Sequence, residues 1–131
     1  MNSFIWIEQR MIMAVHDEQL AEHGGGSGLR DEGLLESALM RPQNIFAYNE
    51  KADICTLAAA YAFGLAKNHP FIDGNKRTAA VAMELFIELN GNRLTSSNAD
   101  GVIMMLKLAG GEMSEDELVT WLRENVAAVQ D

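Results

Sequence analysis

Apolar residues recur along this chain mostly three and four positions apart, and this spacing predicts helices. Residues 8–23 show it first, and the glycine-rich stretch at 24–28 predicts that this helix stops and a loop follows. Asp31 can cap a second helix, whose apolar stripe begins at Leu34. We expect Pro42 to end this second helix, because proline lacks the backbone N–H that a helix interior requires.

The third predicted helix is the most apolar segment of the chain. Residues 54–68 follow Asp53, are rich in alanine and leucine, and carry almost no charge. A helix that is apolar on nearly every side belongs in the middle of a bundle. We therefore expect this helix to form the centre of the fold.

Three further helices are predicted by the residues at their ends. The fourth covers about residues 75–89 and is followed by Asn-Gly, a common helix stop. Ser97 or Asn98 can cap the fifth. Ser114 and Glu117 form a capping box at the start of the sixth.

Strand signals are weak, and only residues 4–7 and 93–95 are candidates. The predicted class is all-α: a compact helical bundle with about six helices. A chain of 131 residues is long enough for one hydrophobic core, so we expect a single domain spanning residues 1–131.

Composition excludes several classes of function. The net charge of −9 repels a phosphate backbone, so no direct nucleic-acid binding is expected. No apolar run approaches membrane-spanning length, so no membrane partner is expected either. Cys55 is the only cysteine, which excludes an internal disulfide and favours a cytoplasmic location.

The residues that can carry chemistry lie between the third and fourth predicted helices, in the segment His-Pro-Phe-Ile-Asp-Gly-Asn-Lys-Arg at 69–77. Pro70 disfavours helical geometry at His69, so this histidine stands at the edge of a loop. Phe71 can pin that loop to the core. Gly74 permits backbone conformations that other residues avoid, and the helix that follows offers free backbone N–H groups to an anion.

Charged side chains around this helix start favour a phosphate ligand. Lys76 and Arg77 lie in the first turn, where the helix dipole disfavours cations unless an anion such as phosphate is bound. Asp73 lies beside them, and a carboxylate next to phosphates is a usual ligand of Mg²⁺. His69 is a base suited to neutral pH. The alternative is a surface loop with a capping asparagine and two solvated cations.

The same segment closely resembles the signature of the Fic superfamily: histidine, proline, phenylalanine, any residue, an acid, glycine, asparagine, any residue, arginine. Lysine at position 76, with Thr78 and Ala79 after the arginine, resembles the Doc (death-on-curing) branch. The stretches at 16–25, 28–36 and 85–91 agree with it, so the resemblance covers most of the chain.

The resemblance implies a role for each residue of the segment. His69 would be the general base that deprotonates a hydroxyl of a target protein, and Asp73 would hold Mg²⁺ on the phosphates of ATP. Gly74, Asn75, Lys76 and Arg77 would bind those phosphates.

The resemblance leaves two transfer reactions open. Most Fic enzymes have glycine at the place of Lys76 and transfer AMP, whereas the Doc branch is associated with transfer of the γ-phosphoryl group. A lysine side chain changes how a triphosphate can lie in the site, which favours phosphoryl transfer. Pro70 and Gly74, however, resemble the AMP-transferring branch, and Ala80 stands where many Fic enzymes have a second arginine.

The resemblance also implies partners. The chain would be the toxin of a type II toxin–antitoxin system, acting on a Ser/Thr hydroxyl of a translation protein, with elongation factor Tu as the expected target and a separate antitoxin as its regulator. A non-catalytic module that binds a nucleotide or a partner is the alternative from another class. Residues 41–48 fall where Fic proteins carry a target-gripping flap, and an exposed Phe46 or Tyr48 would support that role.

Two other features have simpler interpretations. Thr120 and Glu124 match a loose Fic autoinhibitory pattern, but their position on an amphipathic segment favours a packed terminal helix. His16 and His23 are seven residues apart on one predicted helix, about 10 Å along its axis, which is too far for one metal ion. We expect His16 to be a core or supporting hydrogen-bonding residue.

Overall fold

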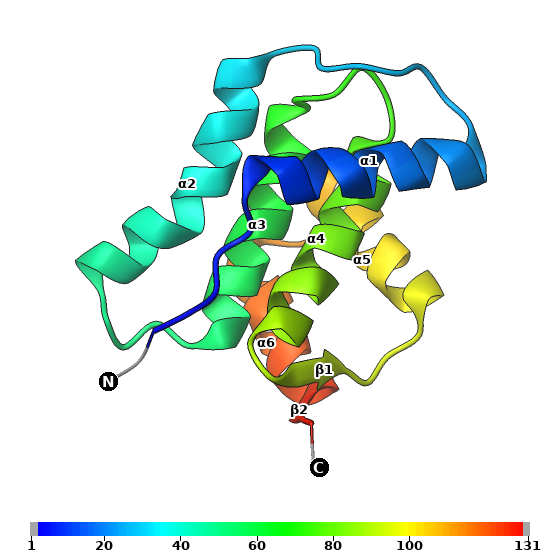
Figure 1. Ribbon diagram of the computed structural model, residues 1–131. Helices are drawn as coiled ribbons and strands as arrows, with labels where there is room; N and C mark the ends of the chain where they lie inside the picture. Colours follow the sequence, from blue (N-terminus) through cyan, green and yellow to red (C-terminus); the bar gives the residue numbers. More distant parts are fainter. Residues whose placement is uncertain (1–2, 130–131) are drawn as a thin grey trace.

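The helix that the sequence makes almost wholly apolar lies at the centre of the structure. A computed structural model describes residues 3–129. Within them there are six helices and one two-stranded antiparallel sheet (Figure 1), which confirms the all-α class. The elements are α1 (Gln9–His23), α2 (Glu32–Tyr48), α3 (Ile54–Asn68), α4 (Asn75–Leu89), β1 (Asn92–Leu94), α5 (Asn98–Ala109), α6 (Glu115–Asn125) and β2 (Val126–Ala128).

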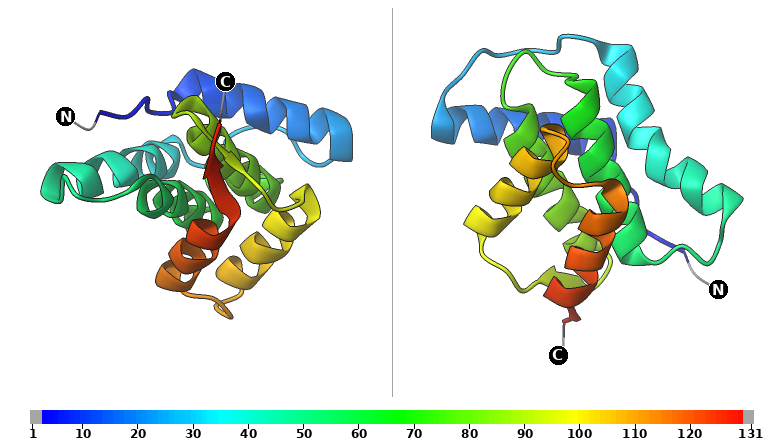
Figure 2. Two further views of the ribbon diagram at one scale, coloured as in Figure 1. Left: turned by 90° about the horizontal axis from the view of Figure 1, so that it is seen from below. Right: turned by 180° about the vertical axis from the view of Figure 1, so that it is seen from behind.

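Helix α3 forms the core because ten of its 15 residues are buried and only Lys67 is exposed. It packs against α2, α4, α5 and α6, which Figures 1 and 2 show arranged around it. Helices α2 and α3 approach closely at Gly64, where a Cβ atom would lie 3.1 Å from the Cα of Ala38. The predicted central position of this helix is confirmed.

The expectation that Pro42 ends the second helix is wrong. Pro42 is buried inside α2, which continues to Tyr48 and changes direction along its length (Figure 1). The last turns are held by tertiary packing, since the ring of Phe46 contacts Phe4 at 5.2 Å between centroids and Trp6 at 5.8 Å. This apolar burial outweighs the lost helical hydrogen bond of proline.

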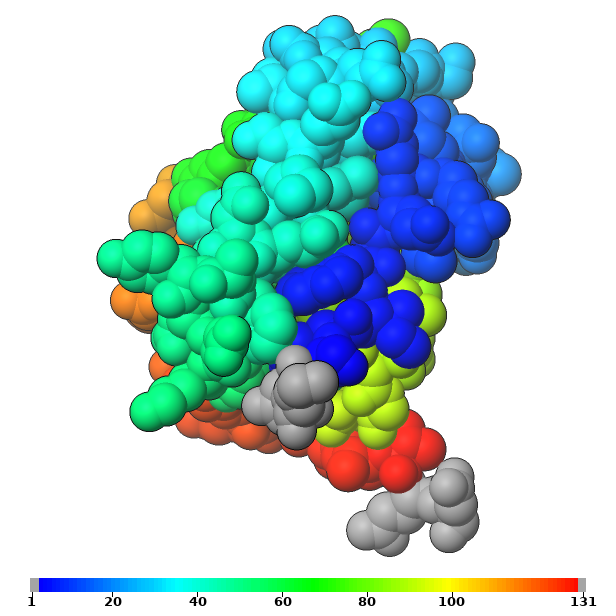
Figure 3. Space-filling model, turned by 60° about the vertical axis from the view of Figure 1, so that its left-hand side comes forward, coloured from blue at the N-terminus to red at the C-terminus, as the bar shows by residue number. Residues whose placement is uncertain are grey.

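The N-terminal segment is extended but forms no strand among the described residues, so the expected strand at 4–7 is wrong. The side-chain amide of Asn90 takes the place of a partner strand, because its Oδ1 accepts from the Ile5 N–H at 2.7 Å and its Nδ2 donates to the Ile5 carbonyl at 3.0 Å. In Figure 3 this dark blue segment lies between α2, in cyan to teal, and the lime-green residues around the end of α4.

The second strand candidate is confirmed as β1, which pairs with β2 in the register Asn92 with Ala128 to Leu94 with Val126. The end signals of the later helices are confirmed too. Ser97 caps α5, and Ser114 and Glu117 form the capping box of α6. Within residues 3–129, no helix is both long enough and apolar enough to cross a membrane.

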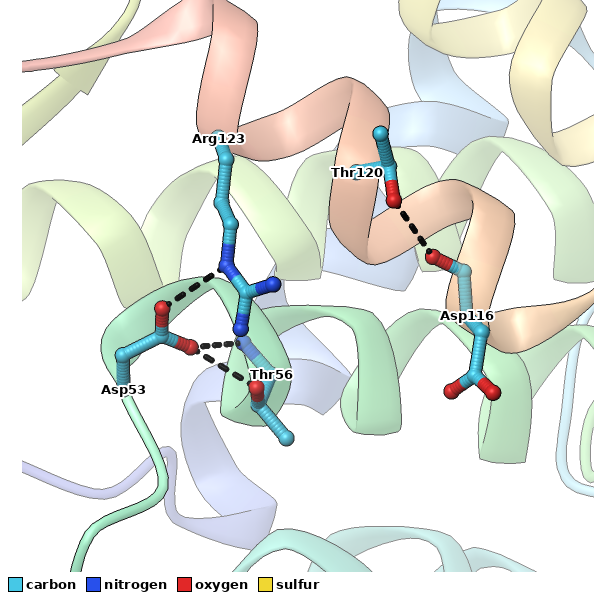
Figure 4. Close-up of polar contacts among 5 residues, drawn as sticks. All are labelled: Asp53, Thr56, Asp116, Thr120 and Arg123. Atoms are coloured by element: carbon cyan, nitrogen blue, oxygen red, sulfur yellow. Dashed lines mark hydrogen bonds and ion pairs between the residues drawn. The ribbon is translucent and has the colours of Figure 1, made fainter.

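Asp53 joins the start of α3 to α6, as Figure 4 shows. Its carboxylate accepts hydrogen bonds from the Thr56 N–H at 2.9 Å and from Arg123 Nε at 3.0 Å. Burial raises the pKa of Asp53, but the hydrogen bonds from Arg123 and Thr56 outweigh it and lower the pKa below its ordinary value. The charged form is therefore favoured by folding.

Replacing Asp53 by alanine is expected to lower the free energy of unfolding by about 1 kcal/mol at pH 7 through loss of the cap alone. Asp53→Asn keeps a capping side chain and removes the charge, so its loss is smaller. Because folding lowers the pKa, this charge stabilises the fold above the unfolded pKa of about 3.9, and the effect is lost as the pH falls through the folded value.

Urea unfolding at pH 7 and pH 3 measures this effect. The difference between wild type and Asp53→Asn should shrink at pH 3. The control is Asp31→Asn, which removes the charge of another capping residue, one that accepts from Leu34 N and forms no ion pair among the described residues. An equal pH dependence in both variants would contradict the role of Arg123.

Candidate active site at the entry to α4

The loop between α3 and α4 begins at His69, whose backbone is left-handed with φ 49° and ψ 55°. It is the only non-glycine residue of positive φ in the described chain, and its side chain is exposed. This conformation turns the chain out of the buried helix. The prediction that His69 stands at the edge of a loop is confirmed.

Phe71 anchors the loop to the core, as expected, with only 1% of its surface exposed. Its ring stacks on the imidazole of His16, with centroids 3.8 Å apart and planes inclined by 8°. Its backbone is held by the side chain of Asn75, which accepts from the Phe71 N–H and donates to the Phe71 carbonyl, both at 2.9 Å. This segment of the loop is therefore fixed from two directions.

His16 holds the far end of the same loop. It is 1% exposed, and its Nε2 lies 2.8 Å from the carbonyl oxygen of Asp73. Because a carbonyl can only accept, Nε2 carries a proton in this contact. The supporting role expected for His16 is confirmed, and no group of three or more possible metal-ligating side chains occurs in residues 3–129.

Asp73 presents an exposed carboxylate beside the start of α4. One of its oxygens accepts from the Gly74 N–H at 2.8 Å and the other from the Gly26 N–H at 3.4 Å. A Cβ atom at Gly25 would lie only 2.8 Å from this carboxylate, and Gly25 has φ +122°. The glycine-rich loop after α1 therefore lies against the site, a role that the sequence analysis missed although the run of glycines was visible.

The start of α4 offers hydrogen-bond donors and positive charge. Gly74 precedes the helix with φ +78°, and the first described backbone bond within this turn runs from Thr78 N to the Gly74 carbonyl. The N–H groups of residues 75–77 have no partner within the helix, and they form the positive end of the helix dipole, as at any free helix start. Lys76 is half-buried, Arg77 is exposed, and neither joins an ion pair within residues 3–129. We call these N–H groups and two side chains the anion site.

Asn75 differs from the other predicted phosphate ligands. Its side chain is buried and both of its polar atoms bond to Phe71, so only its backbone N–H is directed to the anion site. Gly74, Lys76 and Arg77 lie at the start of α4, as the sequence predicts. The phosphate-binding role of all four residues stays a prediction.

A cavity of about 330 Å³ adjoins the anion site between α1, α4 and α5. Arg77 lines it, whereas His69 and Asp73 do not. Glu22 and Glu84 on its walls oppose a phosphate chain. Burial, together with the charge of Glu88, raises the pKa of Glu84. Phosphates therefore fit the loop and the helix start better than this cavity.

The segment that resembles an autoinhibitory pattern lies away from the loop. Thr120 donates to the Asp116 carbonyl of its own helix, and Arg123 contacts Asp53 at the start of α3 (Figure 4). The loop follows the other end of α3, roughly 22 Å along the helix axis at 1.5 Å per residue. This position agrees with a packed terminal helix.

An exposed imidazole, an exposed carboxylate and a cationic helix start, all within nine residues of an all-helical fold, define a candidate site for transfer of a phosphate-containing group. Comparison with known proteins agrees with this class. The profile of the Fic/DOC family matches residues 6–87, which include α1 to α4 up to Ile87 and the whole loop. The chain belongs to the Fic/DOC family.

Two relatives in this family are similar over large parts of their length. "Protein kinase doc" of Escherichia phage P1 is 32% identical over 117 residues, which cover 89% of this chain and 92% of that protein. "Toxin Doc" of Mycolicibacterium smegmatis (strain ATCC 700084 / mc(2)155) is 40% identical over 74 residues, covering 56% of this chain and 57% of that protein.

Proposed function

We propose that this protein is a toxin of a type II toxin–antitoxin system that transfers the γ-phosphoryl group of ATP to a Ser/Thr hydroxyl of a translation protein, with elongation factor Tu as the expected target. The observation that carries the proposal is an exposed Asp73 directly before the anion site, with the exposed His69 at the start of the same loop, while Lys76 and Arg77 form no ion pair within residues 3–129. The names of the relatives, a protein kinase and a toxin, support it.

The proposed reaction uses His69 as general base. Its imidazole takes the proton of the target hydroxyl, whose oxygen then bonds to the γ-phosphorus while the bond to the β–γ bridging oxygen breaks and ADP leaves. The backbone N–H groups of residues 75–77 hold phosphate oxygens. Lys76 and Arg77 offset the charge that builds up on the phosphates.

Asp73 would hold Mg²⁺ together with the phosphates of ATP. The structure fits this role, because Mg²⁺ at nucleotides is usually bound by one or two carboxylates plus phosphate oxygens, and Asp73 is an exposed carboxylate next to the anion site. When bound, the ion would neutralise phosphate charge. The hydrogen bonds from Gly74 and Gly26 and the contact of His16 with the Asp73 carbonyl keep the carboxylate in place.

The target would contact the exposed part of α2. Residues 41–48, which fall where Fic proteins carry a target-gripping flap, form the second half of this helix. Phe46 packs against Phe4, whereas Tyr48 is 96% exposed at the end of the helix. Tyr48 is thus the residue of this segment that supports a target-binding role. An antitoxin would be the second protein partner.

Transfer of AMP is the competing reaction, favoured by the glycine before α4 with φ +78° that resembles the AMP-transferring branch. Incubation with purified elongation factor Tu and Mg²⁺ distinguishes the two. We expect label from γ-³²P-ATP, and not from α-³²P-ATP, to reach the target. Transfer of the α label would identify AMP transfer, and no transfer of either label together with persistent toxicity in cells would identify a non-catalytic binding module.

A further inference from the structure

The segment before α2 runs along the loop that carries His69. Leu29 forms an antiparallel bridge with Phe71, and the Ile72 N–H donates to the Gly28 carbonyl at 3.1 Å. The N–H of Arg30 donates to the Pro70 carbonyl at 2.7 Å. Figures 1 and 2 show these two loops side by side at one end of the bundle.

Arg30 also reaches across with its side chain. Its Nε donates to the His69 carbonyl and its Nη2 to the Asn68 carbonyl, each at 2.7 Å. These two carbonyls lie at the C-terminal end of α3, where carbonyl groups lack helical partners and the dipole favours a cation. One guanidinium thus spans the last residue of the helix and the residue directly after it.

The contacts of Arg30 fall on the one strained residue of the site. A left-handed backbone costs a non-glycine residue about 1–2 kcal/mol, so His69 keeps it only because its surroundings hold it there. Pro70 restricts the following bond, and Arg30 fixes the carbonyl of His69 itself. The direction in which the imidazole leaves the backbone depends on this geometry.

We propose that Arg30 is a positioning residue for the general base: it holds the backbone of His69 left-handed and thereby aims the imidazole at the hydroxyl to be phosphorylated, without touching substrate. This inference rests on the proposed function. Arginine suits the task because its planar guanidinium presents donors at fixed angles to two successive carbonyls, whereas lysine presents a single charge on a flexible stem.

The test compares Arg30→Gln, Arg30→Lys and the control Arg10→Gln, since Arg10 is exposed and, among the described residues, its side chain bonds only to Glu8. In γ-phosphate transfer to elongation factor Tu, we expect Arg30→Gln to lower kcat about 10- to 100-fold, because a displacement of about 1 Å can cost that much. The KM for ATP should change less than about twofold, since the anion site does not include Arg30. Arg30→Lys should retain an intermediate kcat, and Arg10→Gln should match wild type.

The backbone of His69 provides a second measurement that needs no substrate. Its ³J coupling between HN and Hα and its ¹³Cα shift, measured by NMR in the free protein, report the left-handed conformation. We expect this signature to weaken in Arg30→Gln and to persist in Arg10→Gln. The two proposals can fail separately. If the signature weakens in Arg30→Gln but wild type transfers no phosphate, the role of Arg30 in holding the His69 backbone stands and the proposed function is refuted.

Other outcomes overturn the inference. An unchanged kcat in Arg30→Gln would do so, as would a fall in kcat with the His69 signature intact. A variant in which KM for ATP rises while kcat holds would assign Arg30 to ATP binding. Should Arg30→Gln fail to fold, the Arg30→Lys variant carries the test, because its flexible ammonium cannot hold the two carbonyls at the fixed angles of a guanidinium.

Discussion

Replacing His69 by alanine is expected to reduce phosphate transfer to elongation factor Tu by about 10²- to 10⁴-fold, the usual contribution of a general base. The imidazole is exposed, and within the described residues only the backbone of His69 makes hydrogen bonds. The fold should therefore survive, with a melting temperature close to that of wild type. Because histidine is enriched among non-glycine residues of positive φ, the backbone at position 69 would account for any small loss of stability in the alanine variant.

The control for this prediction is His23→Ala. His23 is the other exposed histidine and lies at the end of α1, where its ion pair among the described residues is with Glu22. Initial rates with γ-labelled ATP, measured on proteins with matched circular dichroism, give the comparison. Undiminished transfer by His69→Ala would refute the assignment of the base, whereas equal losses in both variants would indicate a general structural effect.

Replacing Asn75 by alanine is expected to lower the free energy of unfolding by at least about 2 kcal/mol, because each buried backbone group left without a partner costs about 1–3 kcal/mol. The side chain of Asn75 supplies the only described partners of the Phe71 N–H and carbonyl, and both residues are buried. Its amide therefore bonds to the backbone of Phe71 as a neighbouring strand would.

Asn98→Ala is the matched control, since Asn98 is also the first residue of a helix, but its side chain is exposed and makes no described hydrogen bond. Urea unfolding without ATP measures both variants. If Asn75→Ala were as stable as wild type but raised the KM for ATP, the side chain would be a phosphate ligand, as the family resemblance implies. Loss of stability without nucleotide instead supports the contacts to Phe71.

The sequence predicted those elements whose cause is local. Residues 54–68 are apolar on nearly every side, so their central position could be predicted from this pattern, and Ser114 with Glu117 fixed a helix start within four residues. Pro42 misled because its local effect is overridden by aromatic contacts between α2 and the N-terminal segment. Strand β2 gave no signal, since it follows α6 directly and exists only by pairing with β1.

The candidate site shows the same difference between residues with local causes and residues with long-range contacts. His69, Pro70, Asp73 and Gly74 could be found because they are adjacent in the sequence and each has a chemical reason for its place. The residues that support them could not be assigned to the site from the sequence, except that a supporting role was expected for His16. Arg30 reaches the loop across 39 residues of sequence and His16 across 57, so their contacts depend on how α1 and α2 pack and not on any nearby pattern.

The close approach of Gly25 to the carboxylate of Asp73 constrains how this protein can vary. The connection between α1 and α2 looks like a permissive linker, yet any side chain at Gly25 would collide with a carboxylate oxygen. Four residues later the same connection begins its bridge to Phe71. Insertions or substitutions at Gly25 or in the residues that pair with Phe71 would therefore disturb the loop that carries both Asp73 and His69, although they lie in a surface connection.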